Sequence, residues 1–122
     1  MTLPAEPAAV GRARALLERT LEQAGIDEGR RFEARLVTSE LVTNAVSHGS
    51  RRGDEIGVDV SVEGSRLRIG VRDAAHGRTA PVSLSRDEQR AVGRGLAMVE
   101  WLAEWSEQIV DGRREVRAEL TL

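Results

Sequence analysis

Glu40-Leu41-Val42-Thr43-Asn44-Ala45-Val46-Ser47-His48-Gly49 is a segment with two chemically different helical faces. One face is hydrophobic and continues upstream: Val37, Leu41, Val42, Ala45 and Val46. The other face is polar: Ser39, Glu40, Thr43, Asn44, Ser47 and His48. Helical spacing of four residues predicts that Glu40, Asn44 and His48 lie along one side, about 6 Å apart per step.

The polar face lacks the charges that an ordinary solvent-facing helix of this protein should carry. Charged residues make up 31% of the chain, yet Glu40 is the only one between Leu36 and Gly49. Carboxylate and amide oxygens suit Mg²⁺, and a single carboxylate can serve as a general base. The alternative is a half-buried helix whose amide and hydroxyl groups satisfy backbone atoms. The helix alone does not decide between these two interpretations.

The composition predicts one domain, 1–122, and excludes several functions. Aromatic residues make up 2% and the net charge is -2, so neither base stacking nor a basic surface for nucleic acid is indicated. With no cysteine and two histidines, a zinc site is not expected. No apolar run predicts a membrane span, and no secretion signal is evident, so we expect a cytoplasmic protein without a membrane partner.

All 18 basic residues are arginine, a bias that a GC-rich genome would explain. The absence of lysine excludes a P-loop of the GxxxxGK[ST] form and a lysine-dependent protein-kinase fold. Any nucleotide must therefore be held by other means.

Hydrophobic periodicity predicts helices over residues 7–24 and 27–48, and a third from about Gly93. Alternation predicts hairpin strands over 56–62 and 67–71, and a second hairpin over 106–110 and 115–122, with Asp111-Gly112 as its turn. Residues 74–92 show no clear period, and such a long loop is typical of a lid or binding loop. The predicted fold class is α+β, a two-layer sandwich with helices on one face of a mainly antiparallel sheet.

Two further features point toward a ligand. Asp73 shares the buried parity of Leu67, Ile69 and Val71, so its carboxylate should point toward the helical layer, where it needs good hydrogen bonds. The alternative is an aspartate that caps the following loop. Gly93-Arg94-Gly95-Leu96 opens a helix, and its glycines allow backbone N–H groups to approach an anion, although Gly-x-Gly is often only a tight turn.

Taken together and in this order, these features resemble the GHKL ATPases with the Bergerat fold. The short chain is most similar to the bacterial anti-sigma factor serine/threonine kinases and their small histidine-kinase-like relatives. The resemblance covers nearly the whole chain, and the segment 40–49 is its strongest part.

The resemblance implies a role for each matching residue. Glu40 would be the general base or water-orienting carboxylate, Asn44 would ligate the Mg²⁺ that bridges the ATP phosphates, and Asp73 would accept from the adenine amino group. Residues 74–92 would form the ATP lid. The glycine-rich helix start would lie against the phosphates: Gly93, Arg94, Gly95 and Leu96. His48 would be either a helix C-cap or a phosphate contact.

The sequence departs from the family pattern after Asp73. The Asp-x-Gly-x-Gly motif becomes Asp73-Ala74-Ala75-His76-Gly77, which keeps Gly77 in the nucleotide site but adds a methyl group at Ala75, where backbone usually lies close to the base. This change should weaken ATP binding. Residues 1–3 leave little room for the strand that often precedes the first helix.

The implied function is an ATP-dependent kinase that binds a sigma factor and phosphorylates a small anti-anti-sigma (STAS-type) protein, with homodimer formation left open. The alternative is a non-catalytic module of the same fold that sequesters a partner, with or without nucleotide. A detached histidine-kinase catalytic domain ranks last, because no phospho-acceptor helix is recognisable and both histidines fall elsewhere in the pattern.

Overall fold

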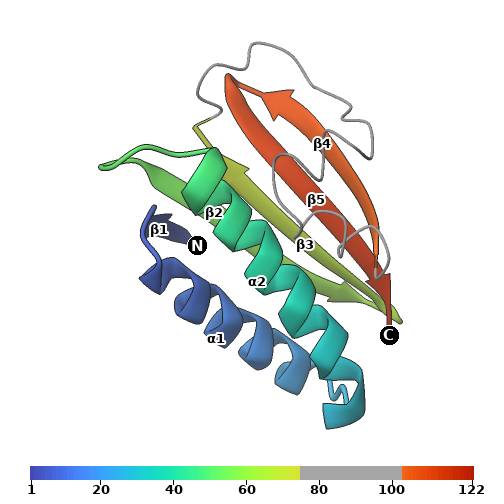
Figure 1. Cartoon of the computed structure of the whole chain (residues 1–122). Coiled ribbons are helices and arrows are strands. Elements are labelled where there is room, and N and C mark those ends of the chain that lie inside the picture. Colours follow the sequence, from blue (N-terminus) through green and yellow to red (C-terminus); the bar gives the residue numbers. More distant parts are fainter. Residues whose placement is uncertain (75–102) are drawn as a thin grey trace.

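The computed structural model describes residues 1–74 and 103–122, and Figure 1 draws the remaining segment as a grey trace. Within the described residues, five antiparallel strands form one sheet in the order β1-β2-β3-β5-β4. Both long helices lie side by side on one face of this sheet (Figure 1), which confirms the predicted α+β two-layer fold. The strands are β1 (Thr2–Pro4), β2 (Glu55–Glu63), β3 (Arg66–Asp73), β4 (Glu104–Val110) and β5 (Arg113–Thr121).

The helices begin and end close to where the periodicity places them. They are α1 (Ala8–Gln23) and α2 (Arg31–His48), and the 3₁₀ turn η1 (Glu28–Arg30) leads into α2. Gly25, at a φ of 72°, follows the end of α1 in a conformation that favours glycine. Asp27 caps η1 by accepting from the Arg30 backbone N–H at 3.2 Å, so the second helical segment starts at the predicted residue.

Two tight turns connect the predicted hairpins. Gly64 joins β2 to β3 at a φ of 59°. Asp111 and Gly112 both have positive φ, 53° and 75°, as the two central residues of a type I′ hairpin turn require. The N-terminal segment also forms a strand, although few residues were available for it: Leu3 pairs with Ile56, and the Met1 amino group donates to the Val58 carbonyl at 2.9 Å.

Side-chain alternation divides the sheet into a buried face and a charged face. Val58, Ile69 and Val71 turn toward the helices and belong to the hydrophobic core. The opposite face carries ion pairs across neighbouring strands, such as Arg72 with Asp59 at 2.8 Å. The Arg72–Asp59 pair is partly exposed, 37% for the arginine side chain and 62% for the aspartate, so it should contribute little to stability.

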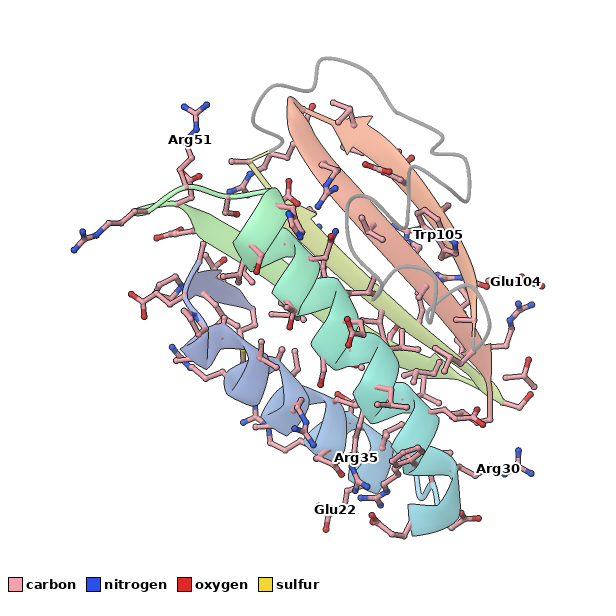
Figure 2. All side chains as sticks on the ribbon, viewed as in Figure 1. Glu22, Arg30, Arg35, Arg51, Glu104 and Trp105 are labelled. Carbon is pink, nitrogen blue, oxygen red and sulfur yellow. The ribbon has the colours of Figure 1, made fainter. Side chains whose placement is uncertain are left out.

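A cluster of ion pairs joins the start of α2 to α1. Glu18 of α1 receives the Arg35 Nε–H and the Arg31 Nη1–H, the latter at 3.2 Å, and Arg35 also contacts Glu28. Figure 2 labels Arg35 at this junction between the two helices. The hydrogen bond from Arg35, aided by Arg31, lowers the pKa of the Glu18 carboxyl below its ordinary value of 4.5.

This lowered pKa predicts a pH-dependent contribution to stability. The unfolded chain binds a proton at Glu18 more readily than the folded one, so the contribution is complete above pH 4.5 and is lost as the pH falls through the folded-state pKa. Glu18→Gln should therefore lower the free energy of unfolding by about 0.2–1 kcal/mol near neutral pH, and by less in acid. Denaturant unfolding of both proteins across the acid range tests this, and a difference independent of pH would contradict it.

No helix in the described segments is long and apolar enough to cross a membrane.

Candidate functional site

The second half of α2 supplies the polar residues of the candidate site. Its hydrophobic stripe packs into the core, with Val37, Leu41 and Val42 almost fully buried, which fixes the rotation of the helix. That rotation leaves Glu40 half-buried and Asn44 only 7% exposed. The polar stripe predicted from the sequence is therefore not a solvated surface at its centre.

Asn44 has a buried polar atom that no described residue satisfies. Its Nδ2 has no hydrogen-bond partner within residues 1–74 and 103–122. A buried amide without a partner costs about 1–3 kcal/mol, so such groups in native proteins usually have a functional or solvent explanation. The same holds for the Ser50 Oγ just beyond the helix. The end of α2 thus offers two polar atoms suited to a polar ligand.

Glu40 lies one turn before Asn44 on the same helix, which places their Cβ atoms about 5–6 Å apart. No arginine in the described residues forms an ion pair with it, although the chain pairs many of its other carboxylates with arginine. Among the described residues, the Glu40 carboxylate is therefore not engaged by an arginine. This environment fits the general base that the resemblance assigns to Glu40.

Asp73 is buried at the end of β3, as its parity predicts, and is only 1% exposed. Its Oδ2 accepts from two donors of Arg114 on β5, Nε at 2.9 Å and Nη2 at 2.6 Å. The pairing register of the two strands places these residues directly opposite each other. The Arg114 Nη1 also lies 3.6 Å from the Glu107 Oε1 on β4. All three side chains are at least 96% buried.

Gly49 brings the end of α2 against this ion pair. A Cβ atom at Gly49 would lie 1.9 Å from the Asp73 Oδ2 and 2.2 Å from its Cγ, so no side chain fits between them. Gly49 is also the C-cap residue of α2, and its N–H donates to the Ala45 carbonyl at 3.2 Å. The carboxylate of Asp73 and the polar end of α2 are therefore immediate neighbours.

For several predicted site residues the proposed role stays a prediction, and some of them lie outside the described residues. His48 is exposed on the last turn of α2, so its role stays a prediction. Gly77 and the helix start at 93–96 are outside the described residues, as is nearly all of the predicted lid. Arg114 was not predicted from the sequence to lie beside Asp73. Its parity with Val116 and Ala118 in the last strand was a signal that it would face inward.

The described residues fit a magnesium-bound triphosphate better than they fit the adenine base of a nucleotide. Asn44 presents a buried Nδ2 without a partner among the described residues, and Glu40 supplies a carboxylate one turn away. The Asn44 N–H groups suit the oxygens of a phosphate, and its amide oxygen suits a hard cation. In contrast, Asp73, the acceptor expected for adenine, already accepts from a buried guanidinium.

Comparison with known proteins identifies the family of this chain. The family model for the histidine kinase-like ATPase domain matches residues 3–120. Among solved structures, the Acinetobacter baumannii histidine kinase AdeS matches with a TM-score of 0.50 and 17% identity, over 99% of this chain and 67% of that chain. At this identity the match supports the fold alone. No protein with curated annotation matches the chain. The family match extends over nearly the whole sequence, and the chain therefore belongs to the histidine kinase-like ATPase domain family, a GHKL-type ATP-binding module.

Proposed function

We propose that the protein is an ATP-dependent serine/threonine kinase of the anti-sigma factor type. It would act in the cytoplasm, bind a sigma factor, and phosphorylate a serine or threonine of an anti-anti-sigma (STAS-type) partner. The observation that carries the nucleotide part of this proposal is the buried Asn44 amide, whose Nδ2 has no partner in the described residues. The family match supports it.

The proposed roles follow from the two polar residues of α2. Asn44 would hold Mg²⁺ through its amide oxygen, and ATP would supply the phosphoryl group. Glu40 would take the proton from the attacking hydroxyl, because it is half-buried and has no cation partner among the described residues. In phosphoryl transfer, positioning and electrostatic stabilisation supply most of the rate, so few protein groups are needed.

The second candidate is a module that sequesters its partner without transferring phosphate. The ion pair between Asp73 and Arg114 favours it, because the expected base acceptor is already engaged. The Ala75 methyl predicted to crowd the base points the same way. Transfer of labelled γ-phosphate from ATP to a partner protein distinguishes a kinase from this module.

We expect the wild-type protein to bind ATP in a Mg²⁺-dependent manner. Asn44→Ala should weaken that binding by at least about tenfold, the scale of one hydrogen bond to a charged group. Isothermal titration calorimetry with and without Mg²⁺ measures this. Thr43→Ala is the matched control, because Thr43 is the exposed neighbour on the same helix and its loss should change nothing. If the folded wild-type protein releases no heat at millimolar ATP, the proposed nucleotide binding is contradicted.

A further inference from the structure

The ion pair between Asp73 and Arg114 places a fixed cation at the residue expected to recognise the base. Two N–H groups of one guanidinium converge on a single carboxylate oxygen, at 2.9 and 2.6 Å. The arginine side chain is 2% exposed and the aspartate 1%, so water does not weaken the contact. Charge-assisted hydrogen bonds of this kind are roughly twice as strong as neutral ones.

We propose that Arg114 is the base-selecting residue of the site. Its guanidinium balances the charge of the Asp73 carboxylate and occupies its Oδ2, which leaves a weaker acceptor for the adenine amino group, so that the wild-type protein binds ATP and GTP with similar affinity. This inference rests on the proposed nucleotide-binding function. It reverses the expectation from Asp73 alone, which is a clear preference for ATP, because GTP carries a carbonyl where ATP carries the amino group.

The surroundings of the pair keep both partners in place. Asp73 has the Gly49 backbone against its carboxylate, at a distance that leaves no room even for a methyl group. Arg114 is held from the neighbouring strand by Glu107, with Nη1 and Oε1 3.6 Å apart. The guanidinium therefore spans β3 and β4 from its position on β5. A neutral amino group of a ligand does not displace a donor held in this way, and it meets a carboxylate whose charge is already balanced.

A buried arginine near a triphosphate site has a second interpretation, with the opposite consequence. If Arg114 attracted the phosphates, its loss would weaken the binding of every polyphosphate, with or without a base. If it withholds Asp73 from adenine, its loss should strengthen the binding of ATP alone. The sign of the change and its dependence on the base separate the two interpretations.

The experiment measures binding of Mg·ATP, Mg·GTP and Mg·tripolyphosphate to the wild type and to Arg114→Gln. Glutamine removes the charge but keeps an amide donor near Asp73, and Arg114→Met is a second variant without any donor. Arg113→Gln is the matched control, because it removes the same charge from the adjacent, exposed residue. Circular dichroism establishes that each variant is folded at the temperature used.

We expect Arg114→Gln to raise the affinity for ATP relative to GTP by about 10- to 150-fold, the value of one charge-assisted hydrogen bond. Tripolyphosphate binding and the Arg113→Gln control should show no such gain. A wild type that already prefers ATP by this factor, or a variant in which all three ligands weaken together, would overturn the role of Arg114 and leave ATP binding intact. Absence of binding of any ligand to any of the folded proteins would overturn this role and the proposed function together.

Discussion

Glu40→Ala should slow phosphoryl transfer to the partner protein by about 10²–10⁴-fold, the usual range for a general base. The affinity for Mg·ATP should change little, because Glu40 is proposed to act on the attacking hydroxyl and not on the nucleotide. The described structure supports this separation, since Glu40 lies a full helical turn from Asn44. Single-turnover transfer and calorimetry on the same preparations measure the two quantities.

Two matched variants test whether a slower transfer in Glu40→Ala results from the loss of a proton acceptor. Glu40→Gln keeps the shape of the side chain but cannot accept the proton, so it should be nearly as slow as Glu40→Ala. Glu33→Ala removes a carboxylate from the exposed first turn of the same helix and should transfer phosphate at the wild-type rate. If the affinity for Mg·ATP falls together with the rate, Glu40 is a metal-binding or structural group and the assignment is wrong.

Local sequence patterns predicted the elements of the fold well, because each pattern acts within one element. The hydrophobic stripe around Leu41 predicted α2 and its orientation, and alternation predicted the strands that carry Val58 and Ile69. The start of β4 was predicted two residues late. Glu107 interrupts the apolar alternation on the inner face of that strand, so the pattern from Trp105 onward did not look like a buried strand. Figure 2 shows Trp105 on β4, and it packs against the core.

The main feature of the candidate site that sequence reasoning missed is the partner of Asp73. Parity predicted that Asp73 faces inward, and the same rule applied to the last strand would have turned Arg114 inward as well. Asp73 and Arg114 are 41 residues apart in the sequence. They meet because of the register in which β3 pairs with β5. No local periodicity specifies such a register. The inward position of Glu107 has the same origin, because the guanidinium that stabilises it belongs to another strand.

Arg114 thus links the stability of the domain to its proposed ligand preference. The residue proposed to weaken recognition of adenine also pairs with two buried carboxylates on the inner face of the sheet, Asp73 and Glu107. A substitution of Arg114 that makes Asp73 a better acceptor for adenine should therefore also destabilise the fold. The two effects are measured separately, one by nucleotide affinity and the other by unfolding without nucleotide.

Arg114→Met is expected to lower the free energy of unfolding by about 3–5 kcal/mol, the range seen when one partner of a buried ion pair is removed. The methionine keeps an apolar stem, so the loss reflects the charge more than the packing. Asp73→Asn should cost less, because Arg114 keeps its contact with Glu107 and an amide oxygen still accepts from the guanidinium. Denaturant unfolding in the absence of nucleotide measures both changes.

The partly exposed pair Arg68–Glu119 is the internal control for this prediction. Its Nε–Oε1 distance is 3.1 Å, but it lies on the charged face of the sheet, so Arg68→Met should cost only about 0.2–1 kcal/mol. The double variant Asp73→Asn with Arg114→Met should be more stable than Arg114→Met alone, because a neutral amide is cheaper to bury than a carboxylate that has lost its guanidinium. Equal losses of unfolding free energy for Arg114→Met and Arg68→Met would show that the buried pair contributes no more than a surface contact, and that Asp73 does not depend on Arg114.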